Sequence, residues 1–259
     1  MELCSYPLHP GKPALGSLVT AEAYREYATA GSGKAPRVPP SVLLCFHAEV
    51  VHRAQEAGWT RSERTLGHSM LLPETEPALI ALHRLPGIGA PMAAATLEDL
   101  IACGLRRCLI VGTAGGLRPE LAPGTLILAD QALRDEGTSW HYLPPARSVE
   151  ASPSLVGELE RALEASELSF ARGTTWTTDA PYRETVEEVV AYRGAGVLSV
   201  EMEAAAVFAV AACRGIEAAA LLVLSDVLDE RGWVPRFFAP EVETGLSNAA
   251  RIGLEVLGG

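Results

Sequence analysis

The strongest constraint on the fold is an alternation of strand and helix patterns between residues 86 and 129. A glycine-containing turn at residues 86–91 precedes apolar residues at helical spacing, which stop at Gly104. A buried strand is predicted at residues 108–111, then a second glycine turn at residues 112–116 and another strand at 125–129. This order predicts an α/β fold, with a largely parallel sheet covered by helices on both faces.

The rest of the chain indicates one domain preceded by an arm. Residues 1–40 are rich in Pro and Gly, so we expect an irregular N-terminal arm with one short helix at residues 21–28. Residues 41–259 contain no internal repeat, low-complexity tract or linker. We therefore expect a single domain over residues 41–259.

Charge and composition disfavour several classes of partner. The formal net charge is −11, whereas a nucleic-acid-binding protein needs a basic stripe to meet phosphates. The longest apolar run, residues 204–213, is too short to cross a bilayer, and the start lacks the features of a signal peptide. The five cysteines form no CxxC pair, and the six histidines form no metal-binding pattern. We expect no nucleic-acid or membrane partner, no metal and a cytoplasmic location.

Two glycine-rich segments are candidates for binding an anion or a ligand. Gly87 and Gly89 stand just before a predicted helix, whose first N–H groups are free to bind an anion. Met92 stands where a GxGxxG motif has its third glycine, which argues against a dinucleotide site. Thr113 and Gly115 lie in the second glycine run, where a ligand would approach the backbone closely. The alternative for both segments is a tight turn without a ligand.

Two acidic segments stand beside buried elements. Glu201, Met202 and Glu203 lead into the apolar helix, and carboxylates there are costly unless they are hydrogen-bonded. A sugar diol would supply such bonds; the alternative is charge that complements the helix dipole. Ser225 and Asp226 follow an apolar strand, at the strand end where α/β sheets bind ligands. Desolvation there would make Asp226 a proton donor, and the alternative is a turn or a helix cap.

These four segments together resemble the nucleoside phosphorylase superfamily, which includes purine nucleoside phosphorylases, uridine phosphorylases and related nucleosidases. The resemblance covers about residues 41–255, with the segments in the family's order. It implies a three-layer αβα sandwich around a mixed, twisted central sheet, with residues 41–259 as the catalytic domain. The matching segments are residues 87–91 (Gly-Ile-Gly-Ala-Pro), 112–117 (Gly-Thr-Ala-Gly-Gly-Leu), 200–205 (Val-Glu-Met-Glu-Ala-Ala) and 225–226 (Ser-Asp).

The resemblance also implies roles for individual residues. Glu203 would bind the ribose hydroxyls, with Met202 packed on the sugar and Glu201 contributing beside them. Asp226 would be the catalytic acid that protonates or hydrogen-bonds N7 of a purine. The implied phosphate or nucleophile region is Gly87, Gly89, Thr113 and Arg134. The implied base pocket is Gly115, Trp176, Thr178, Tyr182 and Arg183.

Two departures from the family pattern leave the nucleophile open. Residues 45–49 read Cys-Phe-His-Ala-Glu where phosphorylases carry a Gly-Asp-Pro-x-Arg-like segment, and Ile110 replaces a second arginine. Either Arg134, His47 or Arg183 replaces these arginines, or water is the nucleophile and the protein is a nucleosidase, with Glu49 as its candidate acid. A non-catalytic nucleoside-binding protein is the third possibility.

The favoured function is phosphorolysis of a nucleoside, with a purine as the expected base. We expect inorganic phosphate as co-substrate and no other cofactor. The resemblance implies a homo-oligomer based on dimers, with a hexamer as one form. His9 in the arm is the candidate for a histidine that family members borrow from a neighbouring subunit.

Overall fold

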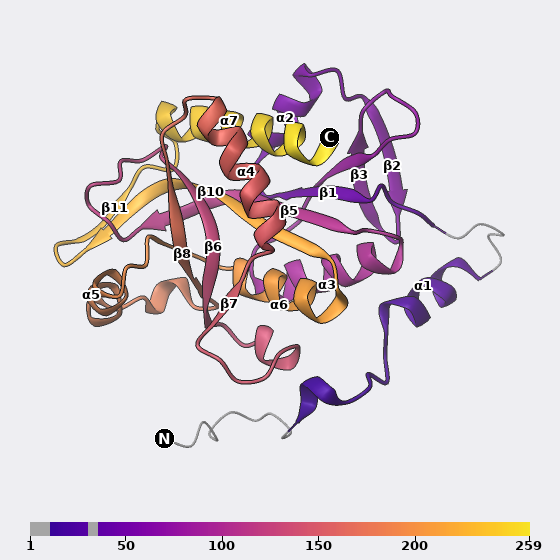
Figure 1. The fold of residues 1–259 in the computed structure, drawn as a ribbon, viewed down its shortest axis with the longest axis horizontal. Helices are drawn as coiled ribbons and strands as arrows, with labels where there is room; N and C mark the ends of the chain where they lie inside the picture. Colours follow the sequence, from indigo (N-terminus) through magenta and orange to yellow (C-terminus); the bar gives the residue numbers. More distant parts are fainter. Residues whose placement is uncertain (1–10, 31–35) are drawn as a thin grey trace.

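The structure is a computed structural model that describes residues 11–30 and 36–259. A mixed sheet runs through the molecule and carries helices on both sides (Figure 1). The strands are β1 (Ser41–Cys45), β2 (Arg61–Thr65), β3 (His68–Leu72), β4 (Ile80–Arg84), β5 (Arg107–Gly116), β6 (Leu126–Asp135), β7 (Ser148–Glu150), β8 (Phe170–Thr178), β9 (Ser199–Glu201), β10 (Glu217–Asp229) and β11 (Gly232–Pro235). The helices are α1 (Ala21–Thr29), α2 (Ala48–Glu56), α3 (Ala90–Ala102), α4 (Pro153–Ala165), α5 (Val186–Gly194), α6 (Ala204–Arg214) and α7 (Pro240–Gly258), with 3-10 turns at η1 (Lys12–Ala14), η2 (Ser139–His141) and η3 (Pro181–Arg183).

The strand order explains how the sheet closes on itself. It runs β11-β10-β6-β8-β9-β5-β1-β4-β3-β2, with β7 paired to β6. Because β10 also pairs with β5, the strands β10, β6, β8, β9 and β5 form a closed ring. Five pairings are parallel, and the others are antiparallel, so the predicted mixed sheet is confirmed. The parallel pairings are β1–β4, β1–β5, β5–β10, β6–β8 and β8–β9.

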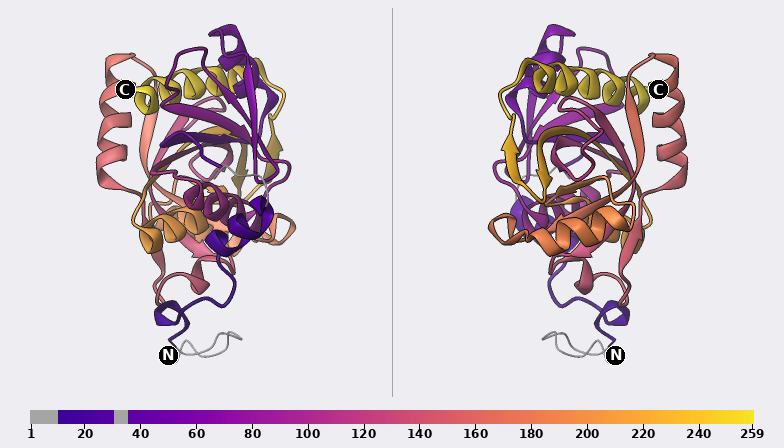
Figure 2. Two further views of the ribbon diagram at one scale, coloured as in Figure 1. Left: turned by 90° about the vertical axis from the view of Figure 1, so that its right-hand side faces the viewer. Right: turned by 90° about the vertical axis from the view of Figure 1, so that its left-hand side faces the viewer.

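Helices cover the sheet in two layers, as predicted for an αβα sandwich. On one side α7 contacts β1, β5 and β10, and it is flanked by α2 and α4. On the other side α6 contacts β6, β8 and β10 and packs against α3 (Figure 2). Every residue from Ala204 to Ala211 is buried, in agreement with the apolar pattern around the whole helix. None of the helices in the described ranges combines the length and apolar character that a bilayer crossing requires.

The second glycine run is not the turn that we predicted. It belongs to β5, which continues to Gly116 and pairs with β10 on one side and β9 on the other. A Cβ atom on Gly115 would lie 2.5 Å from Cδ1 of Leu228 and 3.1 Å from Oδ2 of Asp226. The glycine therefore allows the two neighbouring strands to approach closely inside the ring.

Other strand limits also differ from the sequence prediction. β6 continues from the predicted residues 125–129 to Asp135, and β10 continues through Ser225 and Asp226 to Asp229. A bulge between Leu224 and Asp226 shifts the register there. The hairpin of β2 and β3 was not predicted, because β2 lies at the end of the sheet and its charged residues are mostly exposed.

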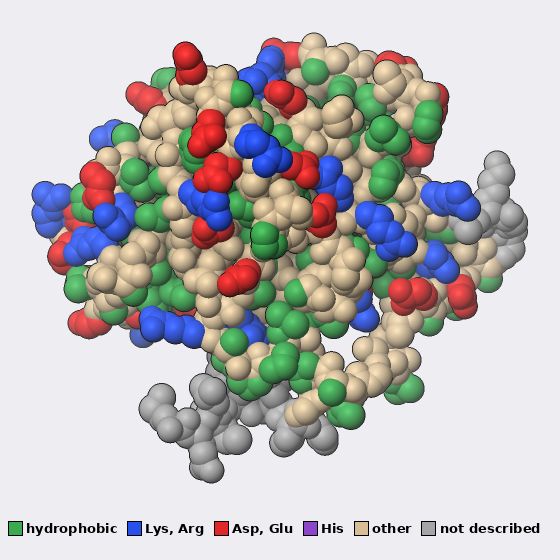
Figure 3. Space-filling model, in the orientation of Figure 1, with side chains coloured by type: hydrophobic (Ala, Val, Ile, Leu, Met, Phe, Trp, Pro, Cys, Tyr) green, Lys and Arg blue, Asp and Glu red, His purple; other side chains and the backbone are tan. Residues whose placement is uncertain are grey.

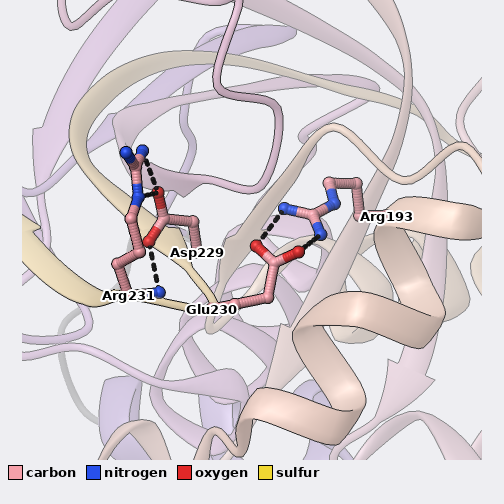
Figure 4. A network of polar contacts seen from close by, with 4 residues as sticks. All are labelled: Arg193, Asp229, Glu230 and Arg231. Carbon is pink, nitrogen blue, oxygen red and sulfur yellow. Dashed lines mark hydrogen bonds and ion pairs between the residues drawn. The ribbon is translucent and has the colours of Figure 1, made fainter.

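Ion pairs hold the turn between β10 and β11 against α5 (Figure 4). Arg193 on α5 donates from one terminal nitrogen to Glu230 at 2.9 Å, and from the other to the second oxygen of the same carboxylate. Arg231 donates to Asp229 from its backbone N–H and its guanidinium, both at 2.7 Å. On the face seen in Figure 3, basic and acidic side chains are intermingled rather than gathered into a basic stripe.

Candidate functional site

Glu203 links the first residues of two helices. It is the residue before α6, and its side chain is 6% exposed. One carboxylate oxygen accepts the backbone N–H of Gly89, the residue before α3. Gly89 has φ = 103°, a conformation that glycine adopts without strain, and this directs its N–H at the carboxylate. The backbone N–H of Met202 also bonds this carboxylate, so two backbone donors hold it between the first residues of α3 and α6.

Glu201 has a different environment from Glu203. Its Oε1 accepts the hydroxyl of Thr177 at 2.5 Å, and its Oε2 accepts the backbone N–H groups of Glu203 and Ala204, each at 2.7 Å. Thr177 in turn accepts the N–H of Ala205 at 3.0 Å. Glu201 therefore caps the first turn of α6 from the end of β9, and its oxygens are occupied by the protein itself.

The two carboxyl groups influence each other's protonation. Burial raises the pKa of both, and the proximity of Glu203 raises that of Glu201 further. Donated hydrogen bonds oppose this effect: Thr177, Glu203 and Ala204 donate to Glu201, and the backbone N–H groups of Gly89 and Met202 donate to Glu203. Burial and mutual repulsion therefore oppose two full charges on this pair, and a ligand that donates to either carboxylate shifts the protonation of both.

Asp226 lies in the bulge region of β10 and is 6% exposed. Its Oδ1 accepts the hydroxyl of Ser225 at 2.7 Å, and its Oδ2 accepts the indole N–H of Trp233 on β11 at 2.8 Å. Gly115 faces the same carboxylate from β5. The structure therefore brings together the predicted residues Gly115 and Asp226.

Glu184 is a further acidic group beside Asp226. It lies just after η3, and burial raises its pKa from 4.5 to about 7, with contributions from the charges of Asp226 and Glu188. Within the described residues, its carboxylate accepts no hydrogen bond. The sequence did not single it out, because no local motif surrounds it.

Thr113 lies close to His47, near the carboxyl ends of β1 and β5. Its hydroxyl lies 3.2 Å from Nε2 of His47, the residue before α2. Burial lowers the pKa of His47, and the positive charge of Arg84 lowers it further. His47 is thus neutral at pH 7, with one ring nitrogen able to accept a proton and the other able to donate one. This pair, together with Gly87 and Gly89 ahead of α3, forms the candidate nucleophile region.

Arg134 does not fit the role proposed from the sequence. It is 5% exposed, and its guanidinium donates to Ser139 Oγ at 2.8 Å and to the carbonyl of Pro144 at 2.8 Å. The same group stacks on the ring of Trp140, 4.6 Å from its centroid. These internal contacts hold the loop after β6, so the donors of Arg134 are already used and it is removed from the anion-binding candidates.

The proposed base pocket is only partly assembled. Trp176 is 1% exposed, donates its N–H to Asp135 at 2.9 Å and packs against Tyr192, so it is a core residue that a base does not reach. Thr178 is buried, and its hydroxyl accepts the N–H of Ala180 at 3.2 Å. Tyr182 is 99% exposed, and Arg183 lies beside it in η3.

The predicted roles of two further residues, Met202 and His9, stay predictions. Met202 is half-buried between Glu201 and Glu203, and its contact with a sugar is not tested by the structure. His9, the candidate for a shared histidine, lies outside the described residues. Trp233 was missed because it reaches Asp226 from a separate strand, and an exposed aromatic residue in a hairpin carries no local pattern for this.

Known proteins resemble this chain in sequence. A guanosine phosphorylase of Halorubrum lacusprofundi is 36% identical over 139 residues, which cover 52% of this chain and 56% of that protein. A uridine phosphorylase of Treponema pallidum is 30% identical over 149 residues, which cover 53% and 58% of the two chains. The chain thus spans a little over half the length of these curated relatives.

Known structures extend the similarity to most of the chain. The uridine phosphorylase of Vibrio fischeri ES114 matches with a TM-score of 0.72 and 27% identity, covering 86% of this chain and 95% of that one. The purine nucleoside phosphorylase of Toxoplasma gondii, solved with immucillin-H, has a TM-score of 0.75 at 21% identity, and supports the fold alone. The model of the phosphorylase superfamily matches residues 32–258. The chain therefore belongs to the phosphorylase superfamily.

Proposed function

We propose that this protein is a nucleoside phosphorylase that cleaves the N-glycosidic bond of a purine nucleoside with inorganic phosphate. The products are the free base and ribose 1-phosphate, and phosphate is the co-substrate with no other cofactor. The observation that carries the proposal is the buried carboxylate of Glu203, which backbone N–H groups fix between the first residues of two helices. Relatives that share about half of their length with this chain carry the names guanosine and uridine phosphorylase.

The chemistry assigns different tasks to the two acidic positions. As the bond from the sugar to the base breaks, its electron pair leaves with the base, and positive charge develops on the sugar. Glu203 would accept the sugar hydroxyls and stabilise that charge, while a phosphate oxygen forms the new bond to the anomeric carbon. Asp226 would bind N7 of the departing purine, and a proton delivered there neutralises the base.

The preference for a purine rests on Asp226. A purine has a basic N7 that an acid can protonate, whereas uracil has no such atom. The carboxylate is buried beside Gly115, and Ser225 and Trp233 hold it in one orientation. Glu184 adds a second acidic group near it, which would favour a base that presents N–H donors.

A nucleosidase is the alternative, and Ile110 is the observation that favours it. This residue is buried in β5 at the position of a phosphate-binding arginine, so that source of positive charge is absent. Release of free base from inosine, adenosine, guanosine and uridine, measured with and without phosphate, separates the cases. Cleavage that requires phosphate supports the proposal; equal cleavage without phosphate, with free ribose, contradicts it. Binding without turnover would indicate a non-catalytic protein.

We also propose a homo-oligomer. Apolar side chains of the N-terminal segment are exposed, among them Leu18 at 99% and Tyr27 at 80%. A groove of about 1240 Å³ lies between this segment and α3. Burial of such side chains against a second copy would be favourable. Light scattering after size exclusion should give a mass that is a multiple of the chain mass; a monomer at micromolar concentration would contradict this.

A further inference from the structure

The missing phosphate-binding arginines raise the question of what positive charge this chain offers instead. Parallel strands end at the same edge of a sheet, and β4, β1 and β5 are parallel neighbours. In this register Cys45, the last residue of β1, lies opposite Arg84, the last residue of β4, and opposite Val111 of β5. Arg84 therefore stands at the edge where His47 and Thr113 meet.

Arg84 has unused donors at this edge. Its Nε donates to the carbonyl of Phe46 at 2.9 Å, which fixes the direction of the side chain toward the segment that carries His47. Within residues 11–30 and 36–259, its two terminal nitrogens have no hydrogen-bond partner, and no carboxylate lies within ion-pair distance. The side chain is exposed, so an anion from solvent can reach these nitrogens.

The contrast with Arg134 shows what distinguishes the two arginines. Arg134 is enclosed by the loop that it holds, with its donors directed at Ser139 and at backbone carbonyls. Arg84 is held through one nitrogen and leaves the planar pair of terminal nitrogens for a ligand. That fork matches two oxygens of a phosphate group.

Neighbouring groups at the edge complete a set of donors. The hydroxyl of Thr113 and the ring of His47 are within hydrogen-bond distance of each other, at 3.2 Å, so an anion that binds beside them can be met by both. β4 is followed by the turn that contains Gly87 and Gly89, and α3 starts there, so the positive end of its dipole lies close to this region. Gly89 also bonds Glu203, which connects this edge to the sugar position.

We propose that Arg84, with His47 and Thr113, binds the phosphate co-substrate in this protein, and that Arg84 supplies the charge which other family members take from arginines at the positions of residues 45–49 and Ile110. This inference rests on the proposed function, since it names the residues that hold its co-substrate. Arg84 comes from β4, so the positive charge enters the site two strands away from Ile110 on β5, with β1 between them.

The test compares Arg84→Gln and Arg84→Lys with a matched control, Arg64→Gln. Arg64 is an exposed arginine on β2 that also donates through Nε to a backbone carbonyl, that of Gly67. We expect Arg84→Gln to raise the KM for phosphate by about tenfold or more, because it loses a charge-assisted pair of hydrogen bonds. Arg84→Lys should recover part of this loss, since it keeps the charge without the fork. The KM for the nucleoside should stay within about twofold of wild type, because uniform loss of one ligand's contacts changes that ligand's KM.

A second measurement does not depend on turnover. Binding of inorganic phosphate alone to each protein is followed by calorimetry and by the phosphorus NMR linewidth, with thermal unfolding as a check on folding. Phosphate binding should be present in wild type and Arg64→Gln and weakened in Arg84→Gln. If wild type carries out phosphorolysis, and Arg84→Gln keeps the wild-type KM for phosphate and the wild-type phosphate binding, the Arg84 assignment is overturned. The proposed function would then still stand. Absence of both phosphorolysis and phosphate binding in wild type would overturn both.

Discussion

The proposed sugar end and the proposed base end of the candidate site are built in different ways. At the sugar end, Glu201 and Glu203 are buried, and their partners are backbone N–H groups of α3 and α6. At the base end, Asp226 is held by Trp233, whose side chain is 59% exposed on the short strand β11. Rigid elements fix the first end, whereas a hairpin at the surface closes the second. This arrangement would suit a family whose members act on different bases but on the same sugar.

The largest effect should come from Glu203. We expect Glu203→Gln to lower kcat/KM by about a hundredfold, because the variant loses the charge that stabilises the developing cation on the sugar. An amide oxygen still accepts the N–H of Gly89, so the fold should remain intact. Steady-state kinetics with thermal unfolding as a control checks this. Activity within a few-fold of wild type would show that the sugar end lies elsewhere.

Asp226→Asn should affect purine nucleosides by about ten- to a hundredfold, as expected for loss of a general acid or its hydrogen bond. Uridine, which lacks N7, serves as the internal control and should be cleaved at an unchanged rate if it is a substrate. Equal losses for inosine and uridine would show that the carboxylate supports the hairpin rather than the base.

Glu201 should matter for stability more than for substrate contact. We expect Glu201→Ala to lower the free energy of unfolding by about 2–3 kcal/mol, because buried N–H groups of α6 and the hydroxyl of Thr177 lose their acceptor. Urea denaturation against Glu203→Gln tests the difference between the two carboxylates. A larger loss of stability in Glu203→Gln would contradict the structural role given to Glu201.

Trp233→Phe should have a smaller effect, about fivefold on kcat/KM for purines, because one neutral hydrogen bond to Asp226 is removed at the surface. The control is Phe238→Leu on the segment after β11, because that side chain is 100% exposed. A loss as large as that of Asp226→Asn would mean that the hairpin decides the orientation of the carboxylate.

The smallest effect concerns Glu184 and pH. Its pKa is raised from 4.5 to about 7, so the folded state holds a proton that the unfolded state gives up. Stability from this group is present below about pH 4.5 and is lost as pH rises through about 7. Glu184→Gln should therefore gain stability relative to wild type over this range, as measured by thermal unfolding at several pH values. A constant difference across the range would contradict the raised pKa.

Local patterns in the sequence predicted the burial of Glu201 and Glu203 and pointed to Asp226, but not the partners that hold Asp226. Glu201 and Glu203 are two residues apart beside an apolar helix, so their burial and their need for donors followed from the sequence. The hydrogen bond from Trp233 to Asp226 joins two strands across a turn. The raised pKa of Glu184 depends on burial, which no local pattern in the sequence indicates. Arg134 was predicted to bind an anion because it is a charged residue near the end of a strand. Its partners are instead carbonyl groups of its own loop, which the sequence does not indicate.

The predicted fold was confirmed where hydrophobic runs were long. The strands at β5 and β10 and the helix α6 were recognised from their apolar residues, although their ends were not. The glycines of β5 were predicted as a turn, since no sequence rule distinguishes a glycine needed for a turn from one needed for close approach of β9 and β10.

The closed ring of β10, β6, β8, β9 and β5 has a consequence for local unfolding. A strand inside a ring has hydrogen-bonded neighbours on both sides, so none of the five can separate from the sheet without breaking two ladders. β2 and β11 at the ends of the strand order have one neighbour each and can detach alone. Amide hydrogen exchange should therefore be slow at Glu201 and Thr177, which lie inside the ring, and fast at Trp233, on a strand that opens without breaking it.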